Sequence, residues 1–181
     1  MPVDMKRVIA ETLAKMVEKT DVDKITATAL IRECHISRQT FYYHFKDLMD
    51  VFQWSVRQAT QEMVKQSLEA EDTHAALQEF IRFSADHYGV MKKLLESHNR
   101  AQLEKLLIEA VGTYLWEVAR HKRLITSADP EDLEIALQFI TYGLVGVLLS
   151  RCGDSHLDQD KLAKQLEPLL INQRLFMERQ S

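Results

Sequence analysis

The chain has 181 residues, a net charge of −4 at pH 7 and 46% apolar residues. This length suits one large helical domain or two small ones, and the apolar fraction is sufficient for a core that needs neither disulfides nor metal. Five glycines and three prolines are few, and no Asn-Gly or Asp-Gly pair separates alternating apolar runs, so long helices are favoured over a β fold. We expect an all-α protein with about nine helices.

The charge distribution does not by itself indicate a nucleic-acid binder. Residues 1–56 are neutral, because eight basic side chains balance eight acidic ones. A local positive excess occurs only in residues 24–46, which contain four basic residues, Lys24, Arg32, Arg38 and Lys46, and one acidic residue, Glu33. Any case for DNA binding therefore depends on a motif rather than on charge.

Cysteine usage and the N-terminal segment favour a soluble cytoplasmic protein. Cys34 and Cys152 belong to no CxxC pair and are expected to be reduced thiols. The first 16 residues carry acids among the apolar side chains, unlike a signal or transit peptide. The longest apolar stretch, residues 139–149, is shorter than the roughly 20 residues that span a bilayer. We expect no membrane partner.

Helical periodicity and capping residues predict four helices in the first part of the chain. They cover residues 5–19, 27–34, 38–44 and 48–69, and Thr26, Ser37 and Asp47 are expected to cap the last three. Residues 20–25 are expected to be a polar turn. We expect a domain boundary near residue 50 without a flexible linker, which gives a DNA-binding domain over 1–50 and a second domain over 51–181.

Five further helices are predicted in the second domain. A helix capped by Thr73 runs to about residue 87, a bend at Tyr88-Gly89 precedes a short helix over 90–97, and a long helix covers 101–122. The next begins at Pro130, with Asp129 as its cap, and ends near residue 151. The last runs from 158 to about 179 and contains a proline at position 168, where a kink is expected.

Residues 26–46 predict a helix-turn-helix with His35-Ile36 at the turn. Its second helix carries polar and aromatic side chains where a solvated helix would carry Glu, Lys and Ala. Arg can bond guanine, Gln can bond adenine, and a Thr methyl can touch the thymine methyl in the major groove. Tyr, Lys and the helix N-terminus can reach phosphates. The predicted DNA-binding residues are Thr26, Thr28, Ser37, Arg38, Gln39, Thr40, Tyr42, Tyr43, His44 and Lys46.

This segment resembles the DNA-binding segment of the TetR family of bacterial regulators. The similarity lies in Leu30-Ile31, Cys34-His35-Ile36 and residues 37–45. It departs from the family pattern at His35, where Gly is usual, at Ile31, where a small residue is usual, and at Leu48, where a basic residue is usual. A His at a position that requires positive φ is tolerated but less favourable. The loss of a basic residue removes one expected phosphate contact.

The resemblance implies a homodimer whose last two helices form a four-helix bundle and space the recognition helices for a palindromic operator. Residues 139–149 are apolar nearly all round, as a helix buried on both sides would be. An ordinary core helix in a monomer is the alternative. The predicted dimer residues are Tyr142, Gly143, Gly146, Val147, Ser150 and Leu169.

The resemblance further implies a ligand-responsive repressor with a small-molecule inducer pocket among its middle helices. Polar-tipped aromatic residues are the preferred candidates because a buried tip needs a partner, although aromatic residues at helical spacing usually belong to the core. The effector candidates are Trp54, Phe83, His87, Tyr88, Tyr114 and Tyr142. The Arg38–Tyr42 run is also similar to regulators of dihydroxyacetone-kinase operons in Gram-positive bacteria. That similarity implies, as the alternative, a transcriptional activator controlled by a protein co-regulator.

Neither a metal site nor an active site is predicted. The seven histidines form no H-x3-H pair, and the sequence has no Gly-rich phosphate loop, G-x-S-x-G elbow or HExxH motif. We therefore expect no cofactor and no enzymatic activity. The competing function class is a helical protein–protein interaction module whose helix-turn-helix binds a protein instead of DNA.

Overall fold

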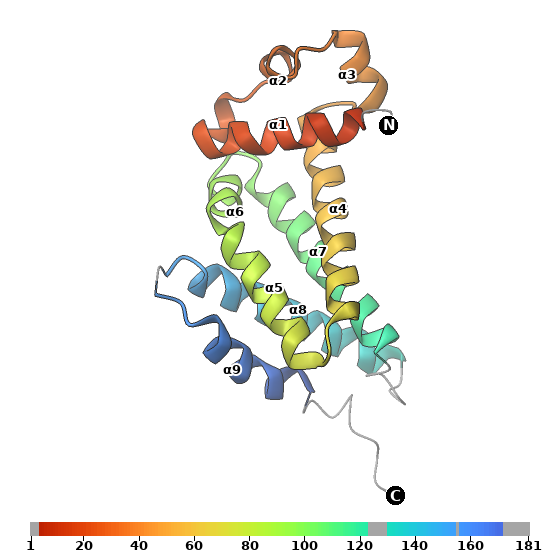
Figure 1. Ribbon diagram of the computed structural model, residues 1–181, viewed down its shortest axis with the longest axis vertical. Coiled ribbons are helices and arrows are strands. Elements are labelled where there is room, and N and C mark those ends of the chain that lie inside the picture. The colour runs from red at the N-terminus through yellow and green to blue at the C-terminus, as the bar shows by residue number, and fades with distance from the viewer. Residues whose placement is uncertain (1–3, 123–129, 155, 172–181) are drawn as a thin grey trace, which may run out of the picture. The chain divides into compact units, whose positions relative to one another are not determined.

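The computed structural model describes residues 4–122, 130–154 and 156–171, and all regular structure in these ranges is helical (Figure 1). The expected all-α class is thereby confirmed. The first helices are α1 (Met5–Lys19), a 3-10 helix η1 (Val22–Lys24), α2 (Ala27–Glu33), α3 (Arg38–His44) and α4 (Leu48–Glu69). They are followed by α5 (Thr73–Asp86), α6 (Tyr88–Leu95), α7 (Arg100–His121), α8 (Pro130–Arg151) and α9 (Gln159–Ile171).

Capping side chains set the helix starts of the N-terminal part, as predicted. The Thr26 hydroxyl accepts a hydrogen bond from the Ala29 amide at 3.1 Å, and the Ser37 hydroxyl accepts one from the Thr40 amide at 2.9 Å. A carboxylate oxygen of Asp47 accepts from the amide at position 50 at 2.9 Å. Each bond satisfies an amide that has no partner within its own helix.

Three local predictions were wrong. Residues 20–25 contain η1, and Val22 and Ile25 within them are buried, so the segment is part of the core rather than a polar turn. The cap of α5 is Asp72, whose carboxylate accepts from the Ala75 amide at 2.7 Å, because a carboxylate one residue earlier competes with Thr73 for the same role. The expected bend at Tyr88-Gly89 lies inside the first turn of α6. The predicted cap at position 129 and the stretch 172–179 lie outside the described residues.

The chain forms two compact units. The first takes the described residues through Ala59 together with Gly89–Leu107, and the second takes Thr60–Tyr88 and the described residues from Ile108 onward. The first unit therefore gains a segment from the middle of the chain, which a simple boundary near residue 50 does not include. The assignment of residues 1–50 as a DNA-binding domain stays a prediction.

The first unit is held by an apolar core beneath the helix-turn-helix. Phe41 of α3 and Leu30 of α2 are fully buried against α1, which contributes Ile9, Leu13 and Val17. Val90 and Leu94 of α6 pack against the same core. Two polar links support them: the Lys93 ammonium donates to the carbonyl of Val17 at 3.1 Å, and the His98 amide donates to the Asp23 carboxylate at 3.0 Å.

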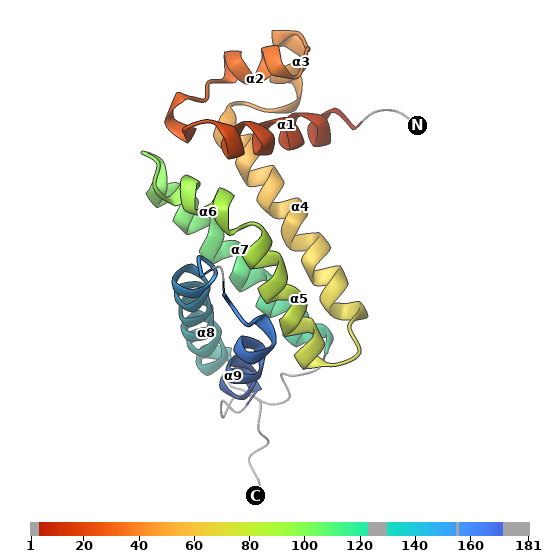
Figure 2. The ribbon, with the colours of Figure 1, turned by 60° about the vertical axis from the view of Figure 1, so that its left-hand side comes forward.

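The second unit is built around α5, which packs against both α9 and α8 (Figures 1 and 2). Residues at helical spacing supply the buried faces of α5, α8 and α9, among them Leu77, Ile81, Ile140, Leu144, Leu162 and Leu166. At the margin of the α5–α9 contact, His74 Nδ1 lies 2.8 Å from Glu167 Oε2 and its Nε2 lies 3.4 Å from Asp160 Oδ1. Gln78 also donates to Asp160, at 2.7 Å.

Helix α8 is the most apolar element. Its 19-residue segment Leu133–Arg151 is long and apolar enough to cross a membrane by length and composition alone, which the shorter stretch 139–149 did not suggest. The core helix of a soluble protein passes the same test. One side of α8, with Leu133, Ile140 and Leu144, is buried within the second unit, so part of its apolar character is explained by packing.

Candidate nucleic-acid interface

The turn between α2 and α3 has a defined backbone geometry that fixes the start of the second helix. The Ile36 amide donates to the Ile31 carbonyl at 3.2 Å and the His35 amide donates to the Arg32 carbonyl at 3.1 Å. This pair of bonds is the Schellman arrangement, in which the residue after the helix cap takes the left-handed conformation. His35 has φ +54°. The expectation that His35 occupies a glycine-like position is therefore confirmed.

Helix α3 presents two different faces. Phe41 is fully buried and the following Phe45 is 2% exposed, so together they anchor the helix on α1 and α2. Tyr42 and Tyr43 are 57% and 83% exposed, and Arg38 on the preceding turn is also exposed. The exposed side of α3 is therefore polar and aromatic, whereas its buried side is apolar.

The structure brings the ten predicted DNA-binding residues together at the start of α2, along α3 and at its exit. Eight of them are exposed and two are half-buried, the half-buried ones being Thr40 and His44. The Ser37 and Thr40 hydroxyl oxygens lie 2.8 Å apart, and Ser37 also caps α3. These two hydroxyls are therefore already engaged in hydrogen bonds within the protein.

Charge is unevenly distributed at the exit from α3. The Lys46 amide donates to a carboxylate oxygen of Asp50 at 3.0 Å, and Asp47 caps α4. Leu48, which stands where the family has a basic residue, packs against the core instead. The backbone at Lys46 is therefore followed by two carboxylates, Asp47 and Asp50, which make the exit from α3 less positive than Lys46 alone would make it.

Two further residues of the first unit bear on the interface. The Lys6 ammonium lies 5.4 Å from the centre of the Phe45 ring, a cation–π contact that holds a positive charge beside the exit of α3. No sequence pattern singled out Lys6, because the pairing depends on tertiary packing. Burial raises the pKa of the Cys34 thiol, which lies between α2 and the core. Cys34 is a free, half-buried thiol.

An apolar surface occupies one side of α8 and α9. Ile135 and Phe139 are each 68% exposed, Leu169 is 61% exposed, and Tyr142 is 54% exposed. The predicted dimer residues Gly143, Gly146 and Ser150 are exposed as well, and Val147 is half-buried. A Cβ atom built on Gly143 or Gly146 would meet nothing within 4 Å. Ile135 and Phe139 were missed, although their spacing to Tyr142 follows one helix face.

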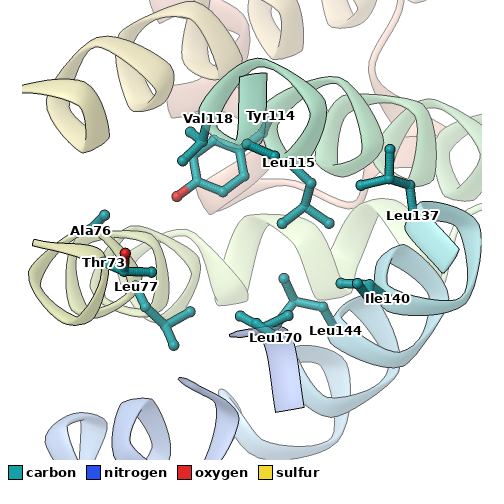
Figure 3. Close-up of a pocket in the computed structure, with 11 residues that line it drawn as sticks. Thr73, Ala76, Leu77, Tyr114, Leu115, Val118, Leu137, Ile140, Leu144 and Leu170 are labelled. Carbon is teal, nitrogen blue, oxygen red and sulfur yellow. The ribbon is translucent and has the colours of Figure 1, made fainter. Parts of the chain in front are cut away.

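The second unit contains a cavity of about 80 Å³ (Figure 3). Among the six effector candidates, only Tyr114 lines it. Its described lining residues are Thr73, Ala76 and Leu77 of α5, Tyr114, Leu115, Val118 and Ala119 of α7, Leu137, Ile140 and Leu144 of α8, and Leu170 of α9.

The other five effector candidates are not brought together. Trp54 lies in the first unit, with its ring centre 6.1 Å from that of Phe45. Phe83 and His87 stack on each other at 4.1 Å. The Tyr88 hydroxyl donates to the Leu149 carbonyl at 3.4 Å, and Tyr142 is exposed on the α8 surface. Contact of these five with an effector stays a prediction. Within the described ranges, no group of three His, Cys, Asp or Glu residues is placed to hold a metal ion.

Comparisons with known proteins bear on the fold. No protein-family model matches the chain, and no curated protein has a significantly similar sequence. Its structure is similar to a solved protein described as the dihydroxyacetone kinase operon activator DhaS, with a TM-score of 0.70 and 14% identity over 94% of this chain and 95% of that chain. It is also similar to the TetR family repressor AlkX from Dietzia sp. strain DQ12-45-1b, described as implicated in biodegradation of n-alkanes. There the TM-score is 0.55 and the identity 16% over 96% of this chain and 98% of that chain. The chain thus has the fold of TetR-type regulators.

Proposed function

We propose that this chain, which shares its fold with TetR-type regulators, is a cytoplasmic DNA-binding transcription regulator. The observation that carries the proposal is the exposure of Arg38, Tyr42 and Tyr43 on a short helix that is otherwise anchored by buried Phe41. A helix of this kind, held rigidly by a capped turn, fits the major groove and offers base-reading side chains on its outer face. No enzymatic activity is proposed.

The proposed working form is a homodimer on a palindromic operator. The exposed apolar residues of α8 and α9, together with Gly143 and Gly146, offer a surface that a second copy can cover, and isologous contacts of this kind are the commonest in homo-oligomers. Because residues 1–56 are neutral, one recognition unit would bind weakly. Two linked units bind far more tightly than one, so dimerisation supplies affinity that charge does not.

Two modes of control remain distinct candidates. A repressor released by a small molecule is supported by the cavity in the second unit and by the similarity to the repressor AlkX. An activator controlled by a protein co-regulator is supported by the higher TM-score to the activator DhaS. A thermal-shift screen with metabolites and a co-purification from the source cells separate the two, because the first expects a stabilising metabolite and the second a bound protein.

The test of DNA binding is a fluorescence-anisotropy titration with the DNA upstream of the protein's own gene. Arg38→Ala is expected to weaken specific binding by about 5- to 150-fold, which corresponds to the roughly 1–3 kcal/mol of one good base contact. Arg82→Ala is the matched control, since Arg82 is an exposed arginine of α5 that pairs with Glu79. Equal affinities of the Arg38 variant and the parent chain would instead support the protein-interaction module.

A further inference from the structure

Small side chains of α5 and α7 line the cavity in the second unit. Ala76 of α5 and Ala119 of α7 are 3% and 5% exposed, and both line the space. Longer side chains at these positions would fill it. Leu137, Ile140 and Leu144 close the side formed by α8 (Figure 3). The small size of Ala76 and Ala119 therefore helps to leave this space open.

The polar tip of Tyr114 is already used within the protein. Its hydroxyl lies 2.9 Å from the hydroxyl of Ser67, which is fully buried and does not line the cavity. The Tyr114 ring stacks on Phe80, with ring centres 4.5 Å apart and planes inclined by 13°. Tyr114 is thus fixed on two sides. It offers the cavity an immobile aromatic wall instead of a free hydrogen-bonding group.

The remaining lining defines the chemistry that can enter. Apart from Thr73 and Tyr114, every lining side chain in the described residues is a hydrocarbon. An ionised group placed there would lose its hydration without gaining a hydrogen-bonding partner. An alkyl chain has no such hydration to lose, and its transfer from water into the apolar cavity is favourable. An engineered apolar cavity of about 150 Å³ in another protein holds benzene. The present volume of about 80 Å³ therefore suits a slender chain better than a ring.

From these observations we infer that the cavity between α5, α7, α8 and α9 binds the short aliphatic chain of an uncharged molecule. Among the described lining residues, Thr73 and Tyr114 carry hydroxyl groups, and that of Tyr114 is paired with Ser67. The hydroxyl of Thr73, the first residue of α5, therefore suits an alcohol or carbonyl at the end of such a chain. The largely hydrocarbon lining of this cavity differs from the lining of polar-tipped aromatic residues that the sequence suggested.

The location of the cavity also gives such a ligand a route to regulation, and this step rests on the proposed function. Leu144 lines the cavity while its neighbour Gly143 lies on the exposed apolar surface, and Leu170 lines it while Leu169 lies on that same surface. A chain inserted behind α8 and α9 pushes on the helices that carry the proposed dimer contacts. Dimer geometry, and with it the spacing of the recognition helices, is then the quantity that changes.

The direct test is methyl NMR of the full chain titrated with 1-pentanol and, separately, with pentanoate at pH 7. The two probes share an alkyl chain and differ in charge. Pentanol is expected to cause saturable shifts of the Leu77, Ile140 and Leu144 methyl groups, and pentanoate is expected to bind at least about tenfold more weakly. Equal binding of both probes, or pentanol shifts confined to the exposed Ile135 and Leu169, would overturn the inference.

Two variants change the cavity in opposite directions. Ala119→Val narrows the cavity and is expected to weaken pentanol binding about tenfold or more. The control is Ala136→Val, at a buried alanine of α8 that does not line the cavity, and it is expected to leave the pentanol affinity unchanged. Leu144→Ala enlarges the space and is expected to admit benzene, which the parent chain excludes. It keeps the inference testable even if the valine variant does not fold.

Unchanged pentanol affinity in Ala119→Val, or no benzene binding in Leu144→Ala, contradicts the assignment of the site. These titrations contain no DNA, so their failure leaves the proposed DNA binding untouched. Conversely, a chain that binds pentanol at the cavity but binds no operator would refute the proposed function alone.

Discussion

The buried hydroxyl pair of Ser67 and Tyr114 allows a quantitative prediction for the stability of the second unit. Ser67 is fully buried, Tyr114 is 5% exposed, and their oxygens are 2.9 Å apart. Burial raises the pKa of Tyr114 to about 12, so its hydroxyl stays protonated at neutral pH and remains able to donate. Removing either hydroxyl strands the other in the core, which costs about 1–3 kcal/mol of unfolding free energy.

The double variant separates this cost from the value of the bond itself. The double variant Ser67→Ala with Tyr114→Phe leaves no stranded hydroxyl. Its loss of unfolding free energy should therefore be close to that of one single variant and smaller than the sum of the two. The coupling between the two sites is then about 1 kcal/mol or more. In a chain of this length, each kilocalorie lowers Tm by about 2–4 °C.

The assay is urea unfolding of the four proteins at one fixed concentration, since the proposed dimer would make stability depend on protein concentration. Tyr43→Phe serves as the control, because Tyr43 is 83% exposed and its hydroxyl has no buried partner to lose. If the loss of unfolding free energy in the double variant equals the sum of the two single losses within about 0.3–0.5 kcal/mol, the reasoning is refuted, because independent sites are additive to that extent.

Three further predictions concern the turn, α9 and the apolar surface. His35→Gly should stabilise the chain by up to about 1 kcal/mol in urea unfolding, because Gly adopts the positive φ at little steric cost, whereas His35→Ala should give no gain. The Glu167 carboxylate beside His74 raises the pKa of that imidazole, so its stabilising contact is fully present below about pH 6.5 and is lost as pH rises through the raised pKa. His74→Gln should therefore flatten the fall in stability from pH 6 to 8; an unchanged slope would count against the contact. Phe139→Glu should yield monomers in light scattering, while Trp116→Glu, at a 41% exposed residue of α7, should not.

Much of the fold follows from local signals that a single sequence carries. The bounds of α1 and α3 and the first residues of α4 and α8 were predicted correctly, because capping side chains and apolar periodicity act over a few positions. The same holds for the left-handed residue His35, whose place in the turn was recognisable from the pattern around it. Local chemistry decides these features, so no tertiary information was needed.

Features that depend on tertiary packing were not predictable in this way. The short helix η1 has a polar sequence, yet Val22 and Ile25 are buried by other parts of the first unit. The place of Gly89–Leu107 in that unit depends on packing by Val90 and Leu94, across a long sequence separation. The cavity residues Ala76 and Ala119 carry no distinctive chemistry, because a cavity is defined by side chains that are small rather than by groups that bind.

The recognition helix is the feature on which the proposed function depends most. It is tested directly by sequencing the DNA fragments that the purified protein retains from its own genome, and those that its Tyr42→Ala variant retains. We predict enrichment of a palindromic sequence whose half-sites are about 10 base pairs apart or a multiple of that, and loss of this enrichment in the variant. Retained fragments without a shared sequence, or the same enrichment in the variant, would contradict a sequence-specific role for α3.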